Sequence, residues 1–172
     1  MCLEFNWEEE LPLLAEDCNE VQKIVIERFA KSDLPNDFFV QQFDLPAKKP
    51  FCDKKYWRSF AKILTSRKLE NTPEIYKKLL IWLQDINWPG SDIIFNFVVE
   101  NINDFSYSIK ETLLEALYNN DDVWIISILT AVYKNKGLTN KEINGQLEKV
   151  QKLLINENNF ENLIKLFDDI LD

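Results

Sequence analysis

The chain has 172 residues, of which 46% are hydrophobic and 13% aromatic, so we predict a single domain with a sizeable core rather than a disordered chain. There is no histidine, which excludes histidine-dependent catalytic triads and the usual imidazole metal ligands. The formal net charge of −9 disfavours nucleic acid as the main partner and favours a basic protein.

The cysteines, glycines and apolar runs of the sequence limit which cellular compartment and which cofactors can be expected. Cys2, Cys18 and Cys52 lack metal-type spacing, so reduced thiols are predicted in place of disulfides or a zinc site. None of the 3 glycines lies in a phosphate-loop motif, and no cofactor is predicted. The longest apolar runs are shorter than the roughly 20 residues that span a bilayer, and the N-terminus is acidic where a signal peptide is basic. We therefore predict a cytoplasmic protein without a membrane partner.

The N-terminal part predicts an arm followed by short helices. Residues 1–20 are acidic with scattered apolar anchors, which favours an arm packed on the protein's own core; docking of this arm on a partner is the alternative. Apolar residues at helical spacing predict a helix over residues 19–31. A short helix over residues 38–43 and a proline-bracketed loop over residues 46–50 are predicted next.

Charge is distributed in blocks along the chain. Residues 1–47 hold 11 acids and 3 bases, residues 48–68 hold 1 acid and 8 bases, and residues 69–172 hold 17 acids and 9 bases. Within the basic block we predict a helix over residues 54–64 with Asp53 as its N-cap.

One face of this predicted helix combines cations with aromatic rings: Lys54, Lys55, Trp57, Arg58 and Lys62. Cations hold phosphates and aromatic rings stack on bases, so nucleic-acid binding is one interpretation of this basic patch. The other interpretation is a solvated helix face whose lysines neutralise the protein's own acidic arm.

Two strongly apolar helices are predicted in the middle of the chain. The run Leu79–Leu83 covers more than one face of a helix, so this helix needs neighbours on both sides. Thr72–Glu74 supplies its start, and Pro89 ends it because proline lacks an N–H and restricts the residue before it. A second helix of the same kind is predicted over residues 93–102.

The second half is punctuated by helix caps. Residues 108–111 and 139–142 both have the spacing of a capping box, and each predicts the start of a helix. Between them, a polar turn at 119–122 precedes a helix that is apolar on all sides and ends near Gly137. A last amphipathic helix is predicted after Asn158.

These helices form three pairs whose starts recur at steps of roughly 31 to 36 residues, a range typical of stacked two-helix repeats. We predict an all-α fold of about eight or nine helices, arranged as a short HEAT-type superhelix of stacked antiparallel pairs, with a globular bundle as the alternative. Residues 1–172 are interpreted as one domain, with an N-terminal arm over residues 1–50 and a helical-repeat core over residues 51–172.

The segment Trp82-Leu83-Gln84-Asp85-Ile86-Asn87-Trp88-Pro89-Gly90-Ser91, followed by Asp121-Asp122-Val123-Trp124, resembles a bacterial family of uncharacterised domains with a tryptophan, leucine, aspartate, asparagine, tryptophan, proline signature. The resemblance covers residues 69–134. It implies a HEAT-like helical fold and supplies no reaction. The second motif departs from the family pattern, because Ile125 and Ile126 replace polar and aromatic residues.

The corner between the two apolar helices carries candidate chemistry. Asp85 and Asp92 flank Trp88, and two close carboxylates with an indole wall can hold a cation or act as an acid–base pair. The structural interpretation is that both carboxylates serve helix ends, while Trp88 is a core anchor whose indole N–H donates to one of them.

A similar arrangement recurs where Asp121 and Asp122 precede Trp124, and the positive end of a helix explains aspartate at such a position. The predicted partner-binding residues are Asp85, Trp88, Asp92, Asp121, Asp122 and Trp124. No catalytic residue and no metal site are predicted.

The leading hypothesis is a non-enzymatic protein–protein interaction module that presents an acidic surface to a basic partner. A bacterial immunity-type inhibitor of a basic toxin or nuclease is its special case, argued by class-level analogy. The alternatives are a nucleic-acid-binding or base-excision protein that uses the basic helix at 54–68, and a carboxylate-dependent enzyme at the Asp85 and Asp92 corner.

Overall fold

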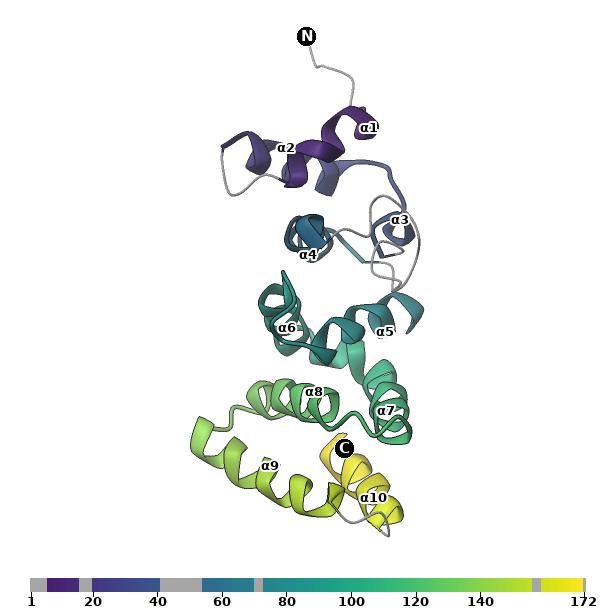
Figure 1. Ribbon diagram of the computed structural model, residues 1–172, viewed down its shortest axis with the longest axis vertical. Helices are drawn as coiled ribbons and strands as arrows, with labels where there is room; N and C mark the ends of the chain where they lie inside the picture. The colour runs from purple at the N-terminus through teal and green to yellow at the C-terminus, as the bar shows by residue number, and fades with distance from the viewer. Residues whose placement is uncertain (1–5, 16–19, 41–53, 70–72, 156–158, 172) are drawn as a thin grey trace.

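The computed structural model describes residues 6–15, 20–40, 54–69, 73–155 and 159–171. Every regular element in these ranges is a helix, which confirms the predicted all-α class. Figure 1 shows an elongated stack with the first helices at one end and the last pair at the other. Within the same ranges, no helix has the length and apolar character needed to cross a membrane.

The described residues contain more α-helices than predicted, because the N-terminal segment adds a short turn of helix of its own. The elements are α1 (Trp7–Glu10), the 3-10 helix η1 (Leu11–Ala15), α2 (Glu20–Lys31), α3 (Asn36–Val40), the 3-10 helix η3 (Lys54–Tyr56), α4 (Trp57–Ser66), α5 (Pro73–Ile81), the 3-10 helix η4 (Trp82–Gln84), α6 (Ser91–Glu100), α7 (Ile102–Tyr118), α8 (Asp122–Asn135), α9 (Asn140–Leu154) and α10 (Phe160–Leu171).

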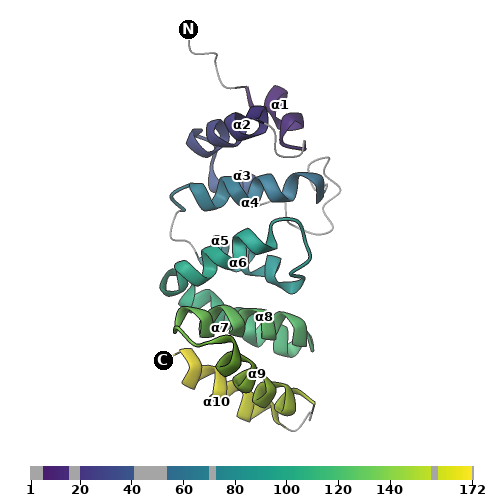
Figure 2. The ribbon, with the colours of Figure 1, turned by 90° about the vertical axis from the view of Figure 1, so that its left-hand side faces the viewer.

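The larger helices are arranged in two layers (Figures 1 and 2). In one layer α2, α4, α6, α8 and α9 pack on one another in that order, and in the other α3, α5, α7 and α10 do so. In the pairs α3–α4, α5–α6 and α7–α8, the first helix lies in the layer of α7 and the second in the layer of α8. The last pair is reversed, because its first helix, α9, packs against α8 and its second, α10, packs against α7. Gly137, in the connection between α8 and α9, has a positive φ of 76°, and α9 packs against α8.

The helices predicted to be covered on more than one side are so covered. Helix α8 packs against α6, α7 and α9, and Ile125, Ile128 and Leu129 are fully buried. Helix α5 packs against α3 and α7, with Leu79 and Leu80 fully buried. Because most apolar side chains of these runs are removed from water, each helix is stabilised mainly by its neighbours in the stack.

One of the two predicted capping boxes forms and the other does not. Thr139 accepts from the backbone N–H of Glu142, and the Glu142 carboxylate accepts from Thr139, which lowers the pKa of that carboxyl. Ser108 lies inside α7, and its hydroxyl donates to the carbonyl of Pro73 at 3.0 Å. The predicted helix start at Ser108 is therefore wrong, because this hydroxyl is satisfied by a distant segment.

The N-terminal elements belong to the same packed body. Leu11 and Leu14 are buried, and the Gln22 amide donates to the Leu14 carbonyl and to the Ser59 hydroxyl, at 3.1 Å in both cases. The structure thus agrees with an arm packed on its own core over residues 6–15. The predicted caps at Asp53, Thr72 and Asn158, the loop at 46–50 and the three cysteines lie outside the described residues.

Arg67 joins the N-terminal helices to α4. Its guanidinium donates to the carbonyls of Phe29, Ala30, Ser32 and Leu34, to the Asn36 side chain at 2.9 Å, and lies over the Phe39 ring. Several of these carbonyls belong to the C-terminal end of α2, where a helix leaves acceptors without intrahelical donors. The Arg67 side chain therefore caps the C-terminal end of α2 and holds the connection between α2 and α3 in place.

We expect Arg67→Ala to lower the free energy of unfolding by about 2 to 3 kcal/mol, because hydrogen bonds from a charged donor are lost and partly buried carbonyls remain. Arg67→Lys should recover only a small part of this loss, since an ammonium cannot reproduce the planar fork of donors. Urea unfolding followed by circular dichroism measures both. A full recovery by lysine would mean that charge, and not the fork, matters here.

Candidate functional site

The corner between α5 and α6 is built by polar side chains that bond to backbone. The Asp85 carboxylate accepts from the backbone N–H of Asn87 at 2.9 Å and from its amide at 3.1 Å. The Ser91 hydroxyl lies 3.0 Å from the carbonyls of both Trp82 and Asp85. Gly90 adopts a left-handed φ of 91°, which completes the turn into α6. Asp85, Gly90 and Ser91 of the tryptophan- and aspartate-containing segment are thus explained by the geometry of this turn.

The same corner packs closely on α4. A Cβ on Gly90 would lie 2.8 Å from the Ala61 Cβ, and the Trp88 and Trp57 rings meet edge to face at 5.3 Å. Arg58 pairs with Asp92 through two bonds of 3.0 Å. Asp85 and Asp92, the predicted acid–base pair, are therefore both engaged in holding the corner.

The basic patch is also engaged within the molecule. Lys54 lies 5.5 Å from the Trp57 ring centroid and 5.4 Å from that of Trp88, and Lys55 lies over the Tyr56 ring at 5.0 Å. Trp57 is 1% exposed, so its ring cannot stack on a base without opening the core. Lys62 is half-buried and has an interaction of its own. Lys54 and Lys55 thus lie over aromatic rings of the same chain, and Arg58 pairs with the Asp92 carboxylate.

The three residues of the second predicted cluster, Asp121, Asp122 and Trp124, have different roles. Asp121 accepts from the backbone N–H of Trp124 at 3.0 Å, which caps α8. The buried Trp124 indole donates to the Leu80 carbonyl at 2.8 Å. Asp122 is exposed and faces a groove.

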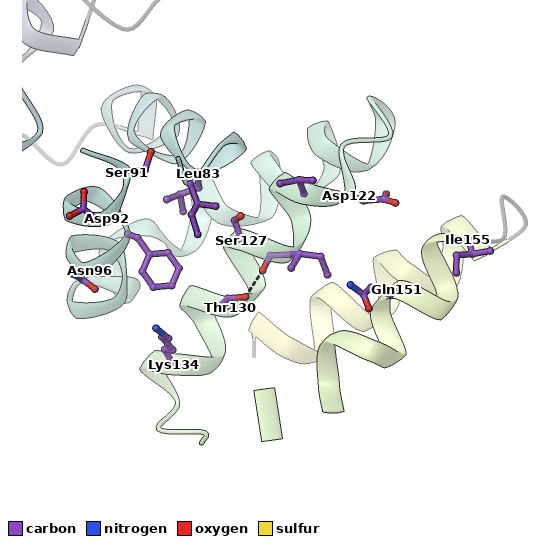
Figure 3. Close-up of a pocket in the computed structure, with 14 residues that line it drawn as sticks. Leu83, Ser91, Asp92, Asn96, Asp122, Ser127, Thr130, Lys134, Gln151 and Ile155 are labelled. Atoms are coloured by element: carbon purple, nitrogen blue, oxygen red, sulfur yellow. Dashed lines mark hydrogen bonds between the residues drawn. The ribbon is translucent and has the colours of Figure 1, made fainter. Parts of the chain in front are cut away.

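This groove has a volume of about 780 Å³ and lies between the corner, α6, α8 and α9 (Figure 3). Its size lies within the range of ligand-binding cavities. It is lined by Leu83, Ile86, Ser91, Asp92, Phe95, Asn96, Asp122, Val123, Ile126, Ser127, Thr130, Lys134, Gln151 and Ile155.

Apolar side chains line the groove and continue onto its rim. Leu83 is buried, while Phe95 and Ile126 are half-buried. Ile86, Val123 and Ile155 are exposed by 63%, 60% and 84%, so apolar surface continues from the concavity onto its rim.

The charges of the groove are arranged along α8. Asn135 donates to the Val99 carbonyl at 2.8 Å, so the C-terminal ends of α6 and α8 are adjacent and the two helices run the same way. Asp92 lies in the first turn of α6 and Asp122 in the first turn of α8, on opposite sides of the groove in Figure 3, while Lys134 lies at the C-terminal end of α8, 4.9 Å from the Phe95 ring centroid. Figure 3 shows Asp122 and Lys134 near opposite ends of α8.

Of the predicted partner-binding residues, Asp92 and Asp122 line the groove, while Asp85, Trp88, Asp121 and Trp124 hold the surrounding scaffold. Sequence reasoning missed the apolar lining. A usable signal was present at Ile155, which directly follows the apolar stripe of α9 and so lies beside the face that packs on the core.

Most polar side chains of the groove are exposed or already hydrogen-bonded within the chain. Both of its carboxylates belong to exposed residues, and Asp92 is already paired with Arg58. The Thr130 hydroxyl donates back to the Ile126 carbonyl, as is common in helices. Among the described residues, no group of three histidine, cysteine, aspartate or glutamate side chains is placed to hold a metal ion.

The sequence matches the model of one protein family over residues 52–171; the description of that family is "Domain of unknown function (DUF5071)". Neither the curated proteins nor the solved structures contain a match to the chain.

Proposed function

We propose that this chain, which belongs to the DUF5071 family, is a non-enzymatic protein-interaction module that binds a basic partner in the groove between α6, α8 and α9. The observation that carries the proposal is the exposed apolar rim formed by Ile86, Val123 and Ile155 around an apolar concavity. In the same proposal, the stacked pairs form a short HEAT-like superhelix and the groove lies on its α6–α8–α9 layer.

The apolar part of the groove supports a macromolecular partner. Large apolar side chains gain roughly 25 cal/mol per Å² when they leave water, and contiguous apolar surface on a monomer commonly marks an interaction site. The rim residues come from three separate segments, the corner, the start of α8 and the end of α9, which suits a ligand that extends beyond the cavity. A segment of another protein meets this condition.

The charge of the chain supports a basic partner. The net charge of −9 attracts cationic proteins at long range, and Asp122 supplies an exposed carboxylate beside the apolar surface. A basic toxin or nuclease neutralised by an immunity-type inhibitor in bacteria is the special case that we propose to test first. The acidic surface would then raise the association rate, and the groove would slow dissociation.

The test is affinity capture from an extract of the native host at low salt, followed by identification of the partner and titration calorimetry with the purified pair. We expect Val123→Asp/Ile155→Asp to weaken binding at least about tenfold, as apolar contacts at the centre of an interface commonly do. Affinity should also fall as salt rises from about 50 to 500 mM.

The chain offers a matched control. Val21 and Ile24 on α2 are exposed by 51% and 59%, resemble Val123 and Ile155 in type, and lie at the far end of the stack. Val21→Asp/Ile24→Asp adds the same charge and should leave affinity within about twofold. Equal weakening by both double variants, or capture of an acidic partner, would remove the groove from the proposal.

A further inference from the structure

Building on the proposed function, we infer that the bound segment is an amphipathic α-helix of about three turns that lies antiparallel to α8, with its lysines or arginines at its C-terminal end. The inference rests on the length of the groove, on the mainly helical backbone of its walls, and on the placement of Asp122 and Lys134.

The length follows from α8. Its groove-lining residues run from Asp122 to Lys134 and recur on one side of the helix, at Val123, Ile126 and Thr130 among others. At 1.5 Å per residue this stripe is about 18 Å long, which matches a helix of roughly 12 residues. An apolar stripe at i, i+3 or i+4 and i+7 on that helix would meet Phe95, Ile126 and Ile155.

The backbone of the groove decides between a helix and an extended segment. Apart from Ile86 in the corner and Ile155 after α9, the lining residues lie on helices, and the backbone N–H and C=O groups in the interior of a helix bond to one another. An extended segment would therefore enter an apolar concavity with its own N–H and C=O groups unpaired, which costs free energy at each group. A helix carries its backbone bonds with it and needs only an apolar face.

The direction follows from charge. Asp122 stands at the N-terminal end of α8, so the negative C-terminal end of a bound helix is favoured at that end of the groove. Asp92 already holds Arg58, which leaves Asp122 to face incoming cations. At the other end Lys134 favours an acidic first turn. Basic residues near a helix C-terminus and acidic residues near its N-terminus also suit the helix's own dipole. The reverse direction would place the cations of the segment beside Lys134.

Two synthetic helical peptides of identical composition and about 14 residues test the inference. Both carry leucines at helical spacing; one has glutamates in its first turn and lysines in its last, and the other has these charges exchanged. By fluorescence anisotropy at low salt we expect the first to bind about tenfold more tightly. The double variant Asp122→Lys/Lys134→Glu should reverse the preference, with circular dichroism to confirm that the variant is folded.

Paramagnetic relaxation reports the direction separately. A spin label on the C-terminus of the first peptide should broaden the methyl signals of Val123 and Ile155 more than that of Thr130, and a label on its N-terminus should do the opposite. Equal binding of the two peptides, or broadening in the reverse order, overturns the inferred direction. If neither peptide binds while capture of the natural partner still depends on Val123 and Ile155, the helical occupant is overturned and the proposed function stands. If the rim variants do not affect the natural partner, the proposed function itself fails.

Discussion

Trp124→Ala is expected to lower the free energy of unfolding by about 3 to 5 kcal/mol, the range of large aromatic truncations in a closed core. Trp124 is 1% exposed and lies on α8, which neighbouring helices cover from both layers. Its indole N–H also bonds to the carbonyl of Leu80, near the C-terminal end of α5 where acceptors lack intrahelical donors. The substitution therefore creates a cavity and leaves a buried carbonyl without its donor. Urea unfolding followed by circular dichroism measures the loss.

Two further variants separate these contributions. Trp124→Phe keeps most of the apolar volume and removes the donor, so we expect a loss of about 1 to 2 kcal/mol. Trp88→Ala should cost less than Trp124→Ala, because Trp88 is only half-buried and packs on Trp57 at the edge of the corner. A larger loss for Trp88 than for Trp124 would show that the corner, and not α8, anchors the stack.

Gly90→Ala is expected to destabilise the protein by about 3 kcal/mol, which combines the cost of a left-handed conformation with that of overpacking. Gly90 has a φ of 91°, and an added Cβ would lie 2.8 Å from the Ala61 Cβ and 3.2 Å from both the Arg58 Cα and the Trp57 carbonyl. Two of these three atoms belong to the backbone of α4, which has little room to move. The corner would have to separate from α4, and the pairing of Arg58 with Asp92 would weaken with it.

The other two glycines serve as matched controls. Gly137 has a φ of 76° with no atom within 4 Å of an added Cβ, so Gly137→Ala should cost only the backbone term of about 1 kcal/mol. Gly145 lies inside α9 with equally open space, and Gly145→Ala should stabilise the protein by about 1 kcal/mol. The measured order of the three variants by urea unfolding is the test. Equal losses at Gly90 and Gly137 would mean that the corner moves away from α4 without cost.

The candidate site was only partly predictable. Asp92 and Asp122 attract attention in the sequence because aspartates beside tryptophans are suggestive, and both line the groove. Trp124 attracts the same attention, yet it lies in the core, because a tryptophan at the start of an apolar helix fits an anchor and a binding residue equally well. Phe95 carries no local signal for a groove, since an apolar residue on a helix implies only that something covers it.

Local chemistry determines most of the secondary structure of this protein. The apolar runs of α5 and α8 and the capping box at Thr139 follow from interactions within a few residues, so they can be predicted from the sequence without knowledge of the fold. The all-α class follows from them. The predicted end of the first apolar helix at Pro89 is wrong: α5 ends at Ile81 and η4 at Gln84, because Asp85 and Ser91 already bond to the backbone of the corner.

Packing between distant segments decides the rest. Ser108 has the sequence of a cap, but its hydroxyl bonds to Pro73 because α5 and α7 are adjacent in the fold. The exchange of layers by α9 and α10 follows no local pattern, and it brings Gln151 and Ile155 beside α8 to form one wall of the groove. A side chain's bonding partners depend on which surfaces meet across the stack, and that choice is made by the burial of the whole set of helices together.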